Sequence, residues 1–201
     1  MIARSGDFGY DTGPSKWRAS KKEEKFSWHG HFISVWKKQK DGTWKVALDC
    51  GIENPEPTGK PEALRTIVPK EDSKAVDLNA GQKSQLEAQQ KFTQAARTDP
   101  TMATLAFAAP EIRVYREGHF PSIGKDAARS LLDATAGRMT FEMLGADMSR
   151  SADLSYTYGK YSKARPKGTE QGHYFQIWQT DDSGAWKLVL DWQQPLPKPP
   201  K

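Results

Sequence analysis

The sequence contains almost no cysteine. Cys50 is the only one among 201 residues, so no disulfide can form within the chain and a cysteine-based metal cage is excluded. We interpret Cys50 as a small hydrophobic residue at the end of a strand. Histidine is scarce as well. His29 and His31 would share one face of a strand, as chelation requires, but no carboxylate companion is nearby. We therefore predict no metal site.

Long apolar runs are also absent. No stretch approaches the roughly 20 apolar residues of a membrane-spanning helix, and we predict no membrane partner. The first ten residues, MIARSGDFGY, lack the apolar core of a secretory signal. We therefore expect a cytoplasmic protein if Met1 is the true start, and a periplasmic or secreted one if a signal precedes Met1.

The chain lacks the common catalytic motifs and a concentrated charge of one sign. GxSxG, the Walker loop, GxGxxG and HExxH do not occur, and we expect no cofactor. The net charge is +5, with 14 basic and 11 acidic residues in residues 1–75 and 16 basic and 14 acidic residues in the remainder. Because this excess is spread as +3 and +2 rather than concentrated, we predict no nucleic-acid partner.

The sequence does contain an internal repeat. The segment GHYFQIWQTDDSGAWKLVLDW at residues 172–192 has a near copy, GHFISVWKKQKDGTWKVALD, at residues 30–49. At a constant offset of 142, the same residue type recurs for Gly30, His31, Trp36, Gly42, Trp44, Lys45, Leu48 and Asp49. Upstream, GDFGYDTG at residues 6–13 resembles ADLSYTYG at residues 152–159 with an offset of 146. The connecting loop is therefore four residues longer in the first copy, and such a repeat indicates two related units.

Each copy is typical of three antiparallel strands. In the second copy we predict them over residues 153–162, 173–180 and 185–193. Alternation in the last strand places its residues on two faces, with Trp186, Leu188, Leu190 and Trp192 on one and Lys187, Val189 and Asp191 on the other. Glycine at the turn between the last two strands, Gly42 in one copy and Gly184 in the other, favours a hairpin.

The residues between the copies have a different character. Residues 55–77 are rich in proline and charge, and we predict a linker there. Asn79 can cap a helix that runs to residue 98, and Pro100 after Asp99 indicates the start of a second helix. The predicted order is helix 79–98, helix 100–107, strand 111–116, helix 125–136 and strand 139–148, followed by the three strands of the second copy.

These features resemble a known superfamily. HFPSIGKDAARSLL at residues 119–132, DLSYTYGKY at 153–161 and the GHYFQIWQ…GAWKLVLDW hairpin, in this order of elements, resemble the nuclear-transport-factor-2-like superfamily, within it the bacterial SnoaL-like group of unknown function. The resemblance implies a cone-shaped α+β fold, in which a curved antiparallel sheet wraps helices around an apolar pocket. The superfamily includes ketosteroid isomerase, polyketide cyclases, dehydratases and non-enzymatic association or transport modules, so the fold does not define an activity.

The two copies differ in completeness. We predict a complete domain over residues 78–195, a tail at 196–201, and only the last three strands of a second domain over residues 1–54. Such strands without helices would expose an apolar surface that includes some of Phe8, Tyr10, Phe32, Val35, Trp36, Trp44 and Leu48. We expect that the chain begins inside a longer protein and that Met1 is internal or a truncated start. The alternative is that the partial copy pairs with the second domain, or with another chain, by sheet packing.

Chemistry of the ketosteroid-isomerase kind needs a carboxylate base and a phenol or acid that stabilises an enolate. The candidates here are Asp191, Tyr156 and His173, although the isomerase's own motif is not present. Since Asp191 recurs as Asp49, we favour a structural role for it. For Tyr156, which shares a sheet face with Tyr158, we favour core packing.

Two functions stay open, as does the question of catalysis. In the first, the cone binds a small hydrophobic ligand and supports isomerase-, cyclase- or dehydratase-type proton transfer. The pocket would then be lined by Phe107, Tyr115, Phe141, Tyr156, Tyr158, Trp178 and Trp192. In the second, the sheet face forms a non-catalytic interaction module, with a homodimer or intramolecular domain pairing as the partner. A pocket of about 300 Å³ favours the first, and a filled cone with an apolar sheet face favours the second.

Overall fold

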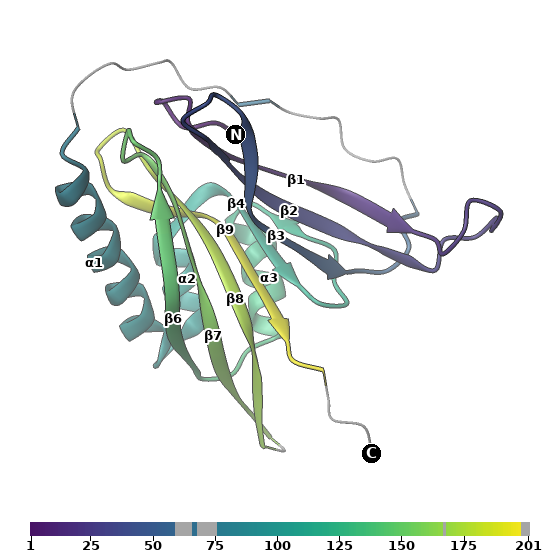
Figure 1. Ribbon diagram of the computed structural model, residues 1–201. Helices are drawn as coiled ribbons and strands as arrows, with labels where there is room; N and C mark the ends of the chain where they lie inside the picture. The colour runs from purple at the N-terminus through teal and green to yellow at the C-terminus, as the bar shows by residue number, and fades with distance from the viewer. Residues whose placement is uncertain (59–65, 68–75, 167, 198–201) are drawn as a thin grey trace.

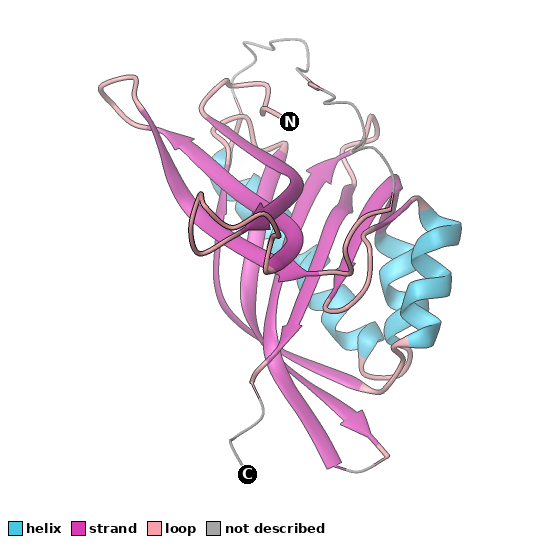
Figure 2. Ribbon diagram, turned by 90° about the vertical axis from the view of Figure 1, so that its right-hand side faces the viewer, coloured by secondary structure: helices cyan, strands magenta, loops and turns pink. Residues whose placement is uncertain are grey.

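The computed structural model describes residues 1–58, 66–67, 76–166 and 168–197, which form three layers (Figures 1 and 2). Helices cover one face of a six-stranded sheet, the large sheet, and a three-stranded sheet, the small sheet, lies on its opposite face. The helices are α1 (Leu78–Ala96), α2 (Pro100–Phe107) and α3 (Lys125–Ala134). The predicted α+β fold, a curved sheet packed on helices and preceded by a separate small sheet, is confirmed.

The large sheet has the strand order β5-β4-β9-β8-β7-β6. Its strands are β4 (Ala108–Arg116), β5 (Ser122–Ile123), β6 (Met139–Met148), β7 (Leu154–Arg165), β8 (Gly168–Thr180) and β9 (Trp186–Pro195). The prediction of an entirely antiparallel sheet is wrong in one place, because β4 pairs with β9 in parallel. The two-residue strand β5, which pairs with β4, was not predicted from the sequence.

Side-chain caps fix the helix starts. Asp77 caps α1, and its carboxylate accepts hydrogen bonds from the backbone N–H groups of Asn79 at 3.0 Å and Ala80 at 3.1 Å. The prediction that Asn79 is the cap is therefore wrong by two residues, because Asp77 precedes the helix and offers the acceptor. The predicted start of α2 at Pro100 is confirmed, and Asp99 caps this helix by accepting from the backbone N–H of Met102 at 2.9 Å.

An aromatic cluster fills the cone between the helices and the large sheet. The ring of Phe92 on α1 lies 6.0 Å from Phe107, 5.5 Å from Phe141 and 5.9 Å from Trp178, measured between ring centroids. Edge-to-face and tilted contacts of this kind add to the apolar burial that holds a helix on a sheet. The helices are therefore fixed to the sheet by large rings that leave little free space.

The small sheet repeats the pairing of the large one. Its strands are β1 (Phe8–Trp17), β2 (Trp28–Lys38) and β3 (Trp44–Glu53), in the order β1-β2-β3. At the sequence offset of 142, each β2–β3 pair coincides with a β8–β9 pair, and both hairpins have a register shift at the same place. Gly42 and Gly184, with φ of 84° and 81°, adopt the left-handed conformation at the two turns. The repeat seen in the sequence is therefore a repeat of structure.

The register shift changes the faces of β9. Trp178 pairs with Leu188 whereas Ile177 pairs with Leu190, so Val189 is an extra residue in β9. Consequently Leu188 lies in the cone and Leu190 on the opposite face. The prediction that Trp186, Leu188, Leu190 and Trp192 share one face is wrong, because simple alternation ignores the bulge.

The small sheet covers the face of the large sheet that points away from the helices. Its buried side chains on this side are Phe8, Ile33, Val35 and Ile52. They pack on a cluster of the large sheet formed by Tyr115, Leu154, Tyr156, Phe175, Ile177, Val189, Leu190 and Trp192. Phe8 stacks on Tyr156 with 5.9 Å between ring centroids. Some of the apolar residues expected to be exposed, among them Phe8 and Val35, are thus buried within the chain.

We expect Phe8→Ala and Ile33→Ala to lower the free energy of unfolding by about 2–5 kcal/mol each, because each leaves a cavity between the sheets. Val46→Ala is the matched control, since Val46 lies on the same small sheet but is 48% exposed. Chemical denaturation of the whole chain measures all three. Equal, small effects for the three variants would contradict the packing of the two sheets.

Candidate functional site

A buried ion pair lies inside the cone. Asp191 on β9 is completely buried, and its Oδ2 accepts a hydrogen bond from Nη2 of Arg116 on β4 at 2.5 Å. Its Oδ1 accepts one from Nε2 of Gln176 on β8 at 2.7 Å. The guanidinium also donates to the backbone oxygens of Tyr115 and Asp191. Asp191 is therefore neutralised and held by neighbouring strands, an arrangement that suits a fixed structural anion better than a proton acceptor.

This ion pair is linked to the helices. Nε2 of Gln89 on α1 donates to Oε1 of Gln176 at 3.2 Å, and Oε1 of Gln89 accepts from Oγ1 of Thr157 on β7 at 3.0 Å. All three side chains are buried. A continuous chain of polar contacts thus runs from α1 across the sheet to Asp191, and each donor and acceptor in it fixes the next.

The mouth of the cone contains a cavity of about 10 Å³, enough for about one water molecule. It is lined by Pro100, Thr101, Thr104, Arg116, Leu132, Thr135, Ala136, Gly137, Met139, Phe141, Lys163 and Gln193. Lys163 is 3% exposed and donates from Nζ to the backbone oxygen of Thr135 at 3.2 Å. Burial, followed by the positive charge of Arg116, lowers the pKa of Lys163 to about 8.

Several buried polar atoms near this cavity have no hydrogen-bond partner within the described part of the chain: Nε of Arg116, the hydroxyl of Tyr174 and Oε1 of Gln193. Burial, and secondarily the charge of Asp191, raises the pKa of Tyr174, so its phenol stays protonated. Unpaired buried polar atoms are costly for a fold. Chemically, these atoms could hold a water molecule or one small polar group. The buried ammonium of Lys163 beside them favours an anion, whereas the charge of Arg116 is already balanced by Asp191.

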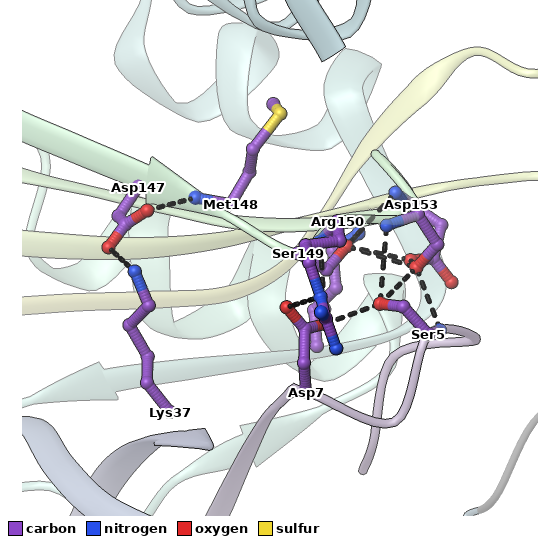
Figure 3. Close-up of polar contacts among 10 residues, drawn as sticks. Ser5, Asp7, Lys37, Asp147, Met148, Ser149, Arg150 and Asp153 are labelled. Carbon is purple, nitrogen blue, oxygen red and sulfur yellow. Dashed lines mark hydrogen bonds and ion pairs between the residues drawn. The ribbon is translucent and has the colours of Figure 1, made fainter. Parts of the chain in front are cut away.

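A second polar cluster, the seam, joins the two sheets (Figure 3). Nε of Arg4 donates to Oδ2 of Asp153 at 3.2 Å, and Nε of Arg150 donates to Oδ2 of Asp7 at 2.9 Å. At the offset of 146, Arg4 corresponds to Arg150 and Asp7 to Asp153. Each arginine therefore binds the aspartate of the other copy, so the two ion pairs are reciprocal.

The serines of the seam repeat this reciprocity. The backbone N–H of Ser5 donates to Oγ of Ser151 at 3.0 Å, and that of Ser151 donates to Oγ of Ser5 at 3.2 Å. The two hydroxyl oxygens lie 2.8 Å apart. Beside this symmetric set, Lys37 on β2 forms an ion pair of 2.5 Å with Asp147 on β6. Residues 4–7 and 150–153 thus meet through equivalent groups, and each contact made by one copy has its counterpart from the other.

The structure divides the predicted pocket residues between the two faces of the large sheet. Phe107, Phe141 and Trp178 lie on the cone side, in contact with Phe92. On the opposite side, Tyr115, Tyr156 and Trp192 lie in the cluster between the sheets. Tyr158 stacks on Tyr156 and is 39% exposed.

The three catalytic candidates are not brought together. Asp191 is inside the cone, Tyr156 is in the cluster between the sheets, and His173 on β8 is exposed. His31 contacts Oδ1 of Asn54 through Nδ1 at 2.7 Å. Among the described residues, no three His, Cys, Asp or Glu side chains converge as metal ligands would. In the same part of the chain, no helix is long and apolar enough to span a membrane.

Sequence reasoning missed Arg116, Lys163, Gln89 and Gln176, which have no local motif. The seam, in contrast, had a signal. Extending the 146-residue offset two positions upstream of Gly6 aligns RSGD at residues 4–7 with RSAD at residues 150–153, and these letters contain both reciprocal ion pairs.

Comparisons with known proteins agree on fold alone. No protein-family model matches the sequence, and no curated protein matches it significantly. A ketosteroid isomerase-like protein from Erwinia carotovora atroseptica is similar in structure, with a TM-score of 0.51, 13% identity, and coverage of 58% of this chain and 96% of that chain. An NTF2-like protein of unknown function from Shewanella oneidensis has a TM-score of 0.47, with 14% identity and coverage of 56% and 97%. A candidate scytalone dehydratase from Novosphingobium aromaticivorans has a TM-score of 0.48, with 17% identity and coverage of 60% and 87%.

Asp191 and its counterpart Asp49 provide a matched test of the buried ion pair. We expect Asp191→Ala to lower the free energy of unfolding by about 3–5 kcal/mol, because Arg116 is left buried without its anion. Asp49 is exposed and accepts a hydrogen bond from Ser34 at 2.6 Å, so Asp49→Ala should cost less than about 1 kcal/mol. Denaturant unfolding of both variants checks this, and a similar loss in the two would contradict the structural role of Asp191.

Proposed function

We propose that this chain is a non-catalytic pairing module, in which the face of the large sheet that points away from the helices binds a second copy of the sheet's own last three strands. Residues 78–195, which have the fold of nuclear-transport-factor-2-like proteins, provide this face. The observation that carries the proposal is the reciprocal seam, in which Arg4 binds Asp153 and Arg150 binds Asp7. Contacts of this kind are typical of surfaces that recognise a copy of themselves.

The apolar contacts support the same function. Ile33 and Val35 of the small sheet correspond to Phe175 and Ile177 of the large sheet at the offset of 142, and all four are buried in one cluster. The two copies thus offer equivalent strand positions to each other. Apolar burial supplies the stabilisation, whereas the reciprocal ion pairs fix the relative orientation of the sheets.

The cone interior favours a non-catalytic role. Its cavity of about 10 Å³ is far below the several hundred Å³ typical of a ligand pocket. A general base must reach the proton it abstracts, but both oxygens of Asp191 accept hydrogen bonds from Arg116 and Gln176. The interior is therefore better suited to holding the sheet and helices together than to proton transfer.

Cutting the linker tests the pairing. The predicted linker over residues 55–77 lies largely outside the described residues, and a protease site inserted in it separates the small sheet from residues 78–201. We expect the two pieces to co-elute in gel filtration at about 10 µM, because the apolar cluster and seam hold them together.

Two variants make this experiment decisive. Ile33→Asp places a charge between the sheets and should separate the cut pieces, whereas Val46→Asp changes the opposite face of the same small sheet and should not. Separation of the unmodified pieces at this concentration would refute the pairing function.

A second candidate function is binding of a small amphipathic anion at the cone mouth. The specific observation in its favour is that Arg116 Nε, Tyr174 Oη and Gln193 Oε1 find no hydrogen-bond partner among the described residues and lie near the buried ammonium of Lys163. Since the cavity holds about one water molecule, the loop that follows α3 would have to move to admit more than a small charged group.

Hexanoate and its neutral analogue hexanamide test this second function. We expect hexanoate to shift the NMR signals of the cone mouth at millimolar concentration and hexanamide not to, because only the anion pairs with Lys163. Binding should weaken as the pH rises through about 8, since the lysine loses its proton there and no longer favours the anion. Lys163→Met should abolish binding and Lys160→Met, at an exposed position of the same strand, should preserve it. Equal binding of the amide would eliminate this candidate.

A further inference from the structure

The face of the small sheet that points away from the large sheet, the outer face, is formed by Phe32, Trp36, Trp44, Val46 and Asp49. By the offset of 142, these positions correspond to Tyr174, Trp178, Trp186, Leu188 and Asp191, which point into the cone of the large sheet. The helices pack on Trp178, Trp186 and Leu188 of the second set. The first set is therefore the counterpart of a helix-covered surface.

Exposure separates the two sets most at the positions on β3, whereas Phe32 and Trp36 on β2 are half-buried. Trp186 and Leu188 are 6% and 0% exposed, whereas Trp44 and Val46 at the corresponding positions are 38% and 48% exposed. Within the described part of the chain, no helix packs on the small sheet. Adjacent exposed apolar side chains on a regular sheet are typical of an interaction surface.

The edge of the small sheet also differs from its counterpart. In the large sheet β9 lies between β8 and β4, and β4 runs parallel to it. In the small sheet β3 corresponds to β9, but among the described strands it pairs only with β2. At the end of this edge the backbone oxygen of Glu53 accepts from the N–H of Gly118 at 2.9 Å, and the residues of β3 before it present backbone N–H and C=O groups that another strand can bind.

Asp49 indicates which charge a strand bound at the edge of β3 carries. Asp49 accepts from Ser34 at 2.6 Å as Asp191 accepts from Gln176, so the two carboxylates have the same orientation relative to their hairpins. Asp191 is neutralised by Arg116, which extends from β4, the neighbour of β9. No basic group of the described residues forms such an ion pair with Asp49.

We infer that the outer face and the free edge of β3 bind a partner polypeptide that supplies an arginine-bearing strand parallel to β3 and an apolar helix over Trp36, Trp44 and Val46. In the large sheet Arg116 pairs with Gln193, whose counterpart in the small sheet is Gly51. The partner's arginine therefore lies beside Gly51 and reaches Asp49 from there. The inference rests on the proposed pairing, because the small sheet exposes its outer face only when its opposite face is packed on the large sheet.

A second copy of this chain fits the surface less well than such a partner. Trp36 donates from Nε1 to Oδ1 of Asp11 at 2.9 Å, so Asp11 as well as Asp49 belongs to this face. Two such faces placed together would oppose carboxylates to carboxylates, which is unfavourable without a cation. A partner with an arginine and an apolar helix complements both the charge and the exposed side chains of Trp44 and Val46.

A peptide with the sequence of residues 78–116 is a suitable probe, because it contains α1, α2 and β4 with Arg116. We expect it to bind the full chain with a Kd in about the micromolar range and to shift the indole N–H signals of Trp36 and Trp44 in NMR spectra. The same peptide with Arg116→Gln should bind at least about tenfold more weakly, since it cannot neutralise Asp49.

Variants of the full chain locate the binding. Val46→Lys should abolish peptide binding, and Leu144→Lys, an equally exposed aliphatic position on β6, should not change it. Asp49→Asn should remove most of the difference between the two peptides, as a double-mutant cycle requires for a direct contact.

The inference is overturned if the peptide does not bind at about millimolar concentration, if Val46→Lys leaves binding intact, or if the chain self-associates through the outer face instead. Its failure is distinguishable from failure of the pairing function. If the cut pieces stay together and the peptide does not bind, only the present inference is lost, whereas separation of the cut pieces removes the pairing function on which it rests.

Discussion

The extra residue in β9 is the constraint on which the rest of the structure depends. By placing Val189 and Leu190 on the same face, it directs Leu188 into the cone and Leu190 toward the small sheet. The same shift turns Asp191 inward, where it meets Arg116. Without it, alternation would direct the carboxylate to the apolar interface between the sheets, where it would lack this partner. One bulge therefore allows a single strand to serve an aromatic core, a buried ion pair and a sheet-to-sheet contact.

The two polar clusters make different contributions. Inside the cone, the contacts from Gln89 to Asp191 join elements that are distant in sequence, and they specify one arrangement of helix and sheet rather than adding much stability. At the seam, the arginines are partly exposed, so each ion pair contributes little energy. Their value lies in geometry, because reciprocal pairs are satisfied together in only one relative placement of the two sheets.

Much of the fold could be predicted from the sequence because its signals are local. Proline after Asp99, glycine at the hairpin turns and the repeat offsets depend on neighbouring residues or on comparison within the chain. The errors have equally definite causes. Alternation could not reveal the bulge at Val189, and the pairing of Arg116 with Asp191 joins positions 75 residues apart on strands whose adjacency the sequence does not show. Residues that face opposite sides of a sheet, such as Trp178 and Trp192, are alike in type, so composition could not assign them to separate surfaces.

The seam also has a consequence for folding and assembly. It joins Arg4 to Asp153, 149 residues away, whereas each hairpin closes through short turns. The hairpins can therefore form early, while docking of the sheets must bring together residues far apart in the sequence and comes late. Until then, the small sheet of one molecule can meet the large sheet of another through the same surfaces. Docking within one chain is favoured over docking between chains only because the two sheets of one chain have a high local concentration. Crowded chains therefore have a direct route to domain-swapped assemblies.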